Sequence, residues 1–305
     1  MYEFKEVIVT LFEGHYHLGV ASLINSLVKS AYKGLVRIGY KGALPKWSFK
    51  LVKTDDNFYK INNEIFLEFV HLQPRMHFGY YKPYFMRDTL ERYPVAHNIF
   101  YFDPDIVVKA PWNFFSNWVD IGIALCLDIS FPFVHKNHPW RNTWKGLSNS
   151  LLDAQLDFYV NSGFVGINSS QMILLDRWIN STEIFKKNGG NIDMFIKDGD
   201  RAIKTDQDIL NAVLTVSPDL NLSVIGAEGM GFSQPAYLMS HDVSTIKPWK
   251  KNHIEFLIKS GRKPTFLDID YLKNANYPIK VYRDFEYGLK KMNLRISSIL
   301  GRIIG

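Results

Sequence analysis

Short apolar runs that alternate with helical patterns are the feature that most constrains how this chain can fold. Val7–Phe12 and Val36–Tyr40 are the first two runs, and a glycine stands two residues beyond each of them. Apolar runs of this length, bounded by turn residues, are typical of buried strands. The same pattern predicts further strands at Ile99–Phe102, Ile106–Val108, Ile121–Leu127, Val160–Ile167 and Leu222–Ile225.

Helical spacing of apolar residues fills the stretches between these runs. It predicts helices at Val20–Ala31, Phe58–Leu72, Tyr84–Arg92 and Gln171–Trp178, and another helix that has Thr205 as its N-cap. Strands that alternate with helices predict an α/β fold, with a mixed and mostly parallel sheet flanked by helices. Ligands of such sheets bind at the carboxyl ends of the strands.

One long segment fits neither pattern. Phe131–Leu147 is rich in proline, histidine, tryptophan and asparagine and has no clear period. We interpret it as a long loop, and loops of this length are often lids or binding loops.

Composition limits the size and the cellular compartment of the protein but does not identify its ligand. The 305 residues suffice for one large domain or two small ones, and the net charge of +6 is compatible with several kinds of anionic ligand. The single cysteine, Cys126, lies in an apolar run, so we expect a buried thiol and no internal disulfide. We expect neither a secretory signal nor a membrane-spanning segment, because no apolar run approaches about 18 residues. A cytoplasmic protein fits these features.

The acidic pair Asp103 and Asp105 follows the apolar run Ile99–Phe102 directly. Two carboxylates separated by one residue can face the same hard divalent cation, which would then take phosphate oxygens as further ligands. Aspartate and proline are also turn residues, so Asp-Pro-Asp alone is compatible with a simple turn.

Two later segments carry further polar groups. His241 could ligate a metal and Lys247 could neutralise a phosphate, although on its own the histidine is more simply explained as an ordinary surface residue. Asp206 and Gln207 follow Thr205 and could bind sugar hydroxyls, or the acids could merely complement the helix dipole.

Four segments taken together resemble a known family. Phe102–Asp105, Asn161–Gly163, Asp206–Asn211 and the segment from His241 to Lys247-Pro248-Trp249 occur in this order. Their order and spacing resemble the glycogenin-like retaining glycosyltransferases of family eight, which have the GT-A (nucleotide-diphospho-sugar transferase) fold. The resemblance covers roughly residues 5 to 255 and suggests a divergent bacterial branch.

The resemblance implies a role for each matching residue. Asp103, Asp105 and His241 would bind the metal, normally Mn²⁺ with Mg²⁺ as the alternative, and Lys247 would bind the donor diphosphate. Asp103 would also lie near the ribose. The donor sugar would contact Asn161, Asp206 and Gln207, and Asp128 resembles an acid near the sugar and the acceptor. Among these, Gln207, Asp206 and Asp128 are the catalytic candidates. Thr10 and Tyr16 fall where the family holds the base, and Lys82 falls near a basic donor contact.

The chain departs from the family pattern at two places near these motifs. Pro104 replaces the usual small residue between the two acids, and the segment Glu13–His17 lacks the aspartate that usually precedes its tyrosine. The identity of the base therefore stays open.

The last 18 residues, 288 to 305, contain four basic residues and no acidic one. Their apolar residues recur at helical spacing, which predicts a basic amphipathic helix. Such a helix can lie on an anionic membrane surface or dock on the protein itself.

We therefore expect a GT-A glycosyltransferase domain at 1–255 and a helical extension at 256–305. The reaction would transfer a sugar from a nucleotide-diphosphate donor, a UDP-sugar being the simplest, to a hydroxyl of a glycan or glycolipid, with retention. No nucleic-acid partner is expected, and the tail could bring the enzyme to the inner membrane face. The alternatives are a nucleotidyltransferase with the same paired carboxylates and a non-catalytic binding protein on this scaffold.

Overall fold

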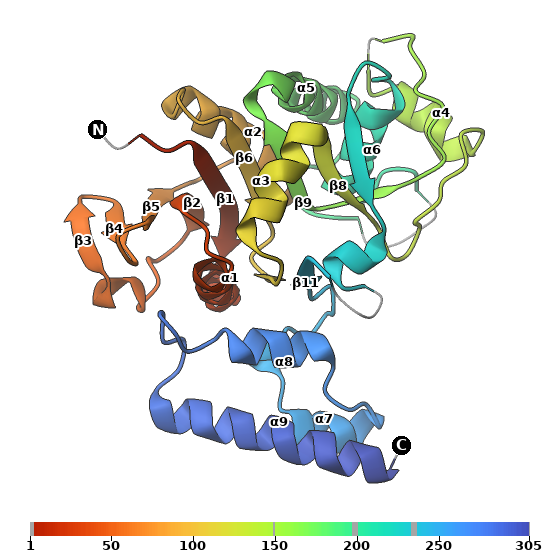
Figure 1. Ribbon diagram of the computed structural model, residues 1–305. Helices are drawn as coiled ribbons and strands as arrows, with labels where there is room; N and C mark the ends of the chain where they lie inside the picture. Colours follow the sequence, from red (N-terminus) through yellow and green to blue (C-terminus); the bar gives the residue numbers. More distant parts are fainter. Residues whose placement is uncertain (1–2, 149, 197–200, 233–236, 305) are drawn as a thin grey trace.

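A nine-stranded sheet forms the centre of the computed structural model, which describes residues 3–148, 150–196, 201–232 and 237–304 (Figure 1). The strand order is β10-β8-β9-β6-β1-β2-β5-β4-β3. The strands are β1 (Glu6–Glu13), β2 (Gly34–Lys41), β3 (Val52–Asp55), β4 (Phe58–Lys60), β5 (Ile65–His71), β6 (Asn98–Phe102), β8 (Ile123–Leu127), β9 (Val160–Asn168) and β10 (Leu222–Ile225). The central strands β6, β1, β2 and β5 are parallel, whereas β9 runs antiparallel to both of its neighbours. The predicted mixed α/β sheet is confirmed.

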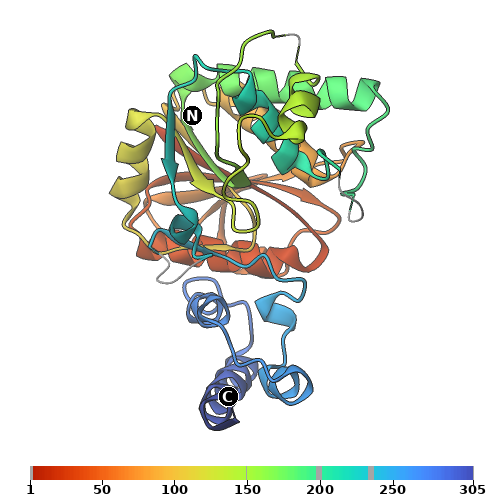
Figure 2. The same cartoon turned by 90° about the vertical axis from the view of Figure 1, so that its right-hand side faces the viewer.

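Helices cover both faces of the sheet, as Figure 2 shows. Alternate residues of β1 point to opposite faces. Val7, Val9 and Leu11 pack in the core that includes α2 (Phe78–Arg92), α5 (Ile173–Lys187) and α6 (Asp206–Thr215). Ile8 and Phe12 pack in the core that includes α1 (His17–Lys29) and α3 (Trp112–Ile121). The sheet is therefore buried on both faces, as its continuous apolar runs require.

The helix predicted at Phe58–Leu72 is wrong, because this segment forms β4 and β5. Asn62 accepts hydrogen bonds from the backbone N–H of Glu64 and Ile65 and so turns the chain between the two strands. Residues Gly34 to Tyr40 of β2 pair with Ile65 to His71. This tertiary pairing outweighs the helical spacing, which short apolar runs satisfy as easily as strand spacing.

The segment Phe131–Leu147 is not a plain loop, because it contains the helix α4 (Pro139–Lys145). Arg141 in that helix is buried and holds the segment in place. Its guanidinium donates to the carbonyls of Val134 and Phe158 at 2.8 and 2.6 Å and to the Thr215 hydroxyl at 2.6 Å. The apolar pattern also misses the helix α3, and Ile121, where it predicts the start of a strand, is the last residue of that helix.

A second sheet of two strands brings distant parts of the chain together. The strand β7 (Ile106–Val108) pairs antiparallel with β11 (Met239–His241), and Ile106 lies opposite His241. This pairing places His241 beside Asp103 and Asp105.

Three helices follow this sheet and lie below α1 in Figure 1: α7 (His253–Ser260), α8 (Phe266–Lys273) and α9 (Asp284–Ile304). The helices α8 and α9 share a small core that includes Trp249, Tyr271 and Tyr282. Asn25 of α1 donates to the carbonyls of Asn274 and Ile279 at 2.7 and 2.8 Å, which ties this core to the sheet domain. Among the described residues, no helix is both long and apolar enough to cross a bilayer.

Candidate active site

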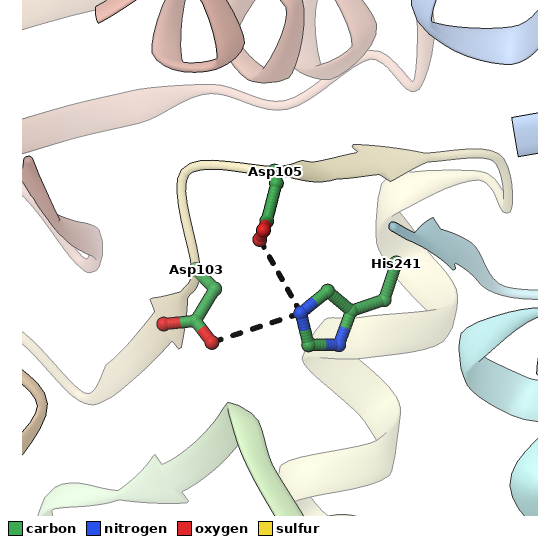
Figure 3. Close-up of side chains that lie close together, drawn as sticks. All are labelled: Asp103, Asp105 and His241. Carbon is green, nitrogen blue, oxygen red and sulfur yellow. Dashed lines mark ion pairs between the residues drawn. The ribbon is translucent and has the colours of Figure 1, made fainter. Parts of the chain in front are cut away.

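Asp103, Asp105 and His241 form a compact cluster at the end of β6 (Figure 3). One potential ligand atom from each residue lies within 4.8 Å of the other two. His241 Nε2 is 3.3 Å from Asp105 Oδ1 and 3.7 Å from Asp103 Oδ2. The structure thus brings together all three residues that the sequence predicted as metal ligands.

The chemistry of this cluster fits a divalent cation. Asp105 Oδ1 is buried and accepts no hydrogen bond from any described residue. A buried carboxylate oxygen without a donor is costly, and a metal ion would satisfy it. The two carboxylates suit Mn²⁺ and Mg²⁺, His241 can add an imidazole nitrogen, and the remaining positions are left for phosphate oxygens.

Lys247 pairs with one acid of the cluster. Its Nζ is 2.7 Å from Asp105 Oδ2, and both side chains are 9% exposed. Burial alone raises the pKa of Asp105, but the nearby His241 and Lys247 outweigh it and hold that pKa well below its ordinary value. Asp105 is therefore an anion that can ligate a cation at neutral pH.

Lys82, from α2, joins the acidic pair to the start of α6. Its ammonium lies 3.2 Å from Asp103 Oδ1 and 3.0 Å from Asp206 Oδ2, and it also donates to the carbonyl of Ser162 at 3.1 Å. Burial lowers the pKa of Lys82, but the two carboxylates raise it above its ordinary value. The lysine stays charged in a buried position because both neighbours are acids.

The residues expected to contact the donor sugar form a continuous polar strip beside the cluster. Asn161 donates to Asp128 Oδ2 at 2.9 Å and accepts from the backbone N–H of Gly163 at 2.8 Å. Asp206 accepts from the Ser162 hydroxyl at 2.8 Å, and Gln207 Oε1 accepts from the Ser162 N–H at 3.2 Å. The end of β8, the first residues of β9 and the start of α6 thus meet at one place.

The sequence left open whether the acids at the start of α6 bind a sugar or only stabilise the helix. The structure shows the second role for one of them. Thr205 is the N-cap, and Asp208 completes a capping box by accepting from the Thr205 N–H at 2.9 Å. Asp208 therefore stabilises the helix. Asp206 instead pairs with Lys82 and Ser162.

Thr10 and Tyr16, expected near the base, occupy different surroundings. Thr10 is fully buried in β1, and its hydroxyl has no hydrogen-bond partner among the described residues. Tyr16 is half-buried before α1, and its ring centroid is 5.9 Å from Lys247 Nζ and 5.5 Å from the Trp249 ring. Tyr16 thus borders the lysine of the cluster, whereas Thr10 lies within the sheet.

Three residues at the site were assigned no role from the sequence. The hydroxyl of Tyr101 donates to Asp103 Oδ1 at 2.8 Å, and Ser162 links Lys82 to Asp206. Gly163 matters by its small size. Strand alternation could have indicated Tyr101, since residues i and i+2 share a face.

Replacing Gly163 with alanine is expected to lower the affinity of the cluster for Mn²⁺ by roughly 10- to 100-fold, the range found when the support of metal ligands is disturbed. A Cβ at this position would lie 2.4 Å from His241 Cε1 and 2.9 Å from Asp103 Oδ2, so both ligands must move. Isothermal titration with Mn²⁺ measures the effect. Gly288→Ala, whose Cβ meets nothing within 4 Å, is the control, and equal affinities of the two variants would refute the prediction.

Comparisons by sequence give no relative, because no protein-family model and no curated protein matches the chain. Solved structures do match. The apo structure of the bifunctional glycosyltransferase WbbM superposes with a TM-score of 0.56 at 16% identity, over 96% of this chain and 52% of that one. The chain thus spans about half the length of WbbM.

The galactosyltransferase LgtC matches over nearly its whole length. Its complex with donor and acceptor sugar analogs superposes with a TM-score of 0.50 at 15% identity, over 93% of this chain and 99% of that one. An active-site mutant of LgtC gives a TM-score of 0.52 at 14% identity over the same shares. The chain therefore has the GT-A fold that these glycosyltransferases share.

Proposed function

We propose that this protein transfers a sugar from a nucleotide-diphosphate donor to a hydroxyl of a glycan or glycolipid. The cluster of Asp103, Asp105 and His241, with Lys247 paired to Asp105, is the observation that carries the proposal. The glycosyltransferase fold of the chain supports the same reaction. UDP-sugars are the simplest donors, the configuration at the anomeric carbon would be retained, and a cytoplasmic site of action suits nucleotide sugars.

Asp103, Asp105 and His241 would hold the divalent ion, Mn²⁺ in the first instance. Once bound, the ion supplies positive charge where the departing diphosphate accumulates negative charge. Lys247 supplies a second positive charge next to Asp105, as a point charge that a flexible side chain can direct to phosphate. Because Lys247 stays protonated beside Asp105, it can serve this purpose at neutral pH.

The polar strip would orient the donor sugar. Asn161 and Asp128 hold one another, and Asp206 is fixed by Lys82 and Ser162, so these groups are oriented before a substrate arrives. Such preorganisation avoids rearrangement during the reaction. Gln207 is a poor nucleophile because it is an amide. The acceptor hydroxyl would therefore attack on the face that the leaving group vacates, and the departing phosphate would take its proton.

A thermal-shift panel tests the proposal directly. The melting temperature is expected to rise by about 5 °C when a UDP-sugar and Mn²⁺ are both present near 100 times the dissociation constant, and far less with either alone. Chelation with EDTA should reverse the shift. The proposal fails if no nucleotide diphosphate or nucleotide sugar gives a metal-dependent shift. Turnover of a nucleoside triphosphate with release of pyrophosphate would instead indicate a nucleotidyltransferase.

A further inference from the structure

The helix α9 has two unlike faces, and its inner face is docked on the protein. Tyr287 donates from its hydroxyl to the Leu272 carbonyl at 3.1 Å, and Ser297 donates to the His253 carbonyl at 2.9 Å. Asn293 accepts from the His253 N–H at 2.8 Å. The sequence left open whether the tail docks on the protein itself or on a membrane. Docking on the protein is correct for the inner face of α9.

The outer face of α9 is apolar and has no partner among the described residues. Phe285 is 79% exposed, Met292 is 54% exposed and Ile303 is 77% exposed. Leu289, Ile296 and Ile299 continue the same stripe at spacings of three and four residues. A stripe of large apolar side chains along 21 residues of helix is far more than scattered surface residues would give.

A groove of about 540 Å³ lies between α8 and α9 and adjoins this stripe at Met292. Its floor is apolar and includes Ile269, Leu272 and Leu294. Three cations, Lys273, Lys291 and Arg295, complete the lining together with Tyr287. None of these three cations forms an ion pair with a described residue, and the groove lining contains no carboxylate.

The charge continues along the helix beyond the groove. Lys291, Arg295 and Arg302 are spaced by four and seven residues, so they line one side of α9 between the groove and the apolar stripe. The acidic residues of the helix, Asp284 and Glu286, are confined to its first turn. The surface thus combines an apolar channel, an apolar stripe and a row of positive charge.

This combination selects among possible occupants. An anionic phospholipid fits both features of the groove. Its acyl chain suits the apolar floor, and its phosphate suits the cations. A second copy of the chain fits less well, because a two-fold contact would set Lys291 and Arg295 against their own copies, and the groove lining has no acid to neutralise them.

We propose that the α8–α9 groove binds an anionic membrane phospholipid, with the acyl chain among Ile269, Leu272 and Leu294 and the phosphate at Lys273, Lys291 and Arg295. The apolar stripe of α9 then enters the headgroup region of the same leaflet, with the helix axis parallel to the membrane. This binding needs neither the metal nor the donor, so its success or failure is independent of the proposed reaction.

Vesicle flotation of the full-length protein, without metal or nucleotide, tests the surface. Binding to phosphatidylcholine vesicles that contain phosphatidylglycerol is expected to exceed binding to phosphatidylcholine alone by at least about tenfold. The double charge reversal K291E/R295E should abolish the difference. The control is K46E/K50E, which changes the net charge equally at two exposed lysines of the sheet domain and should bind like the parent protein. Equal binding of K291E/R295E and the parent would overturn the proposal.

Two further measurements distinguish lipid binding in the groove from binding by charge alone and from dimerisation. Dihexanoyl-phosphatidylglycerol, below its micelle concentration, should bind the parent protein, whereas glycerol 3-phosphate, which has no acyl chain, should bind at least about tenfold more weakly. Equal binding of the two ligands would refute the groove. A concentration-dependent dimer in sedimentation velocity that M292D/I296D dissociates would show instead that a second copy covers the stripe.

Discussion

Replacing Asp105 with asparagine is expected to lower the rate of sugar transfer by roughly 10²- to 10³-fold, the effect of losing one group that stabilises developing charge. The amide keeps the shape of the side chain and can still accept from Lys247. It loses the negative charge that a metal ligand needs. The loss affects Asp105 Oδ1, the one carboxylate oxygen of the cluster that is buried without a hydrogen-bond donor among the described residues. Because Lys247 is left buried without its anion, the melting temperature should fall in the absence of ligands, and the Mn²⁺-dependent thermal shift should disappear.

Asp268→Asn is the matched control for this variant. Asp268 is also a buried aspartate paired with a lysine at 2.7 Å, but it lies at the N-terminus of α8 and outside the cluster. Its replacement breaks a buried ion pair and weakens a capping box, so it should also lower the melting temperature, with transfer retained at temperatures below melting. If both variants lose transfer equally, Asp105 is important only for the fold.

The cluster of Asp103, Asp105 and His241 could be predicted from the sequence because its residues belong to motifs that resemble those of a known family. Asp103 and Asp105 directly follow a short apolar run, so they lie at a strand end once that run forms β6. His241 needed the order of several motifs, since its partners lie more than 130 residues away. The structure supplies the physical link, which is the pairing of β7 with β11.

Other features could not be predicted because they depend on partners far away in the chain. The apolar residues between Phe58 and Leu72 fit a helix or a strand, and only the neighbouring β2 decides between them. The helix α4 depends on the buried Arg141, whose acceptors lie on three other segments. The two faces of α9 likewise follow from which side α7 and α8 cover.

Lys82 is a residue of the site whose partners could not be predicted from the sequence. The sequence predicts it near a donor contact, and that role stays a prediction. The structure adds that its ammonium is shared between Asp103 and Asp206, at 3.2 and 3.0 Å. Lys82 and Asp206 are almost fully buried, with side chains 6% and 5% exposed. Two acids from different motifs are thereby held together by one cation.

Replacing Lys82 with methionine is therefore expected to lower the free energy of unfolding by about 3–5 kcal/mol, because it leaves a buried carboxylate without its cation. Denaturant titration measures the loss. Lys109→Met is the control, because Lys109 pairs with Asp270 at 3.0 Å but is 32% exposed, and its loss should cost no more than about 1 kcal/mol.

The double variant K82M/D206N distinguishes lost charge pairing from lost packing. The change Asp206→Asn removes the negative charge that methionine leaves unpaired, so the double variant should regain at least about 1 kcal/mol over Lys82→Met alone. Mn²⁺ should also stabilise Lys82→Met more than the parent protein, since a cation at Asp103 replaces part of the missing positive charge. If neither the second substitution nor Mn²⁺ restores stability, Lys82 acts through the packing of its aliphatic chain. In that case its charge does not hold the acidic pair and α6 together.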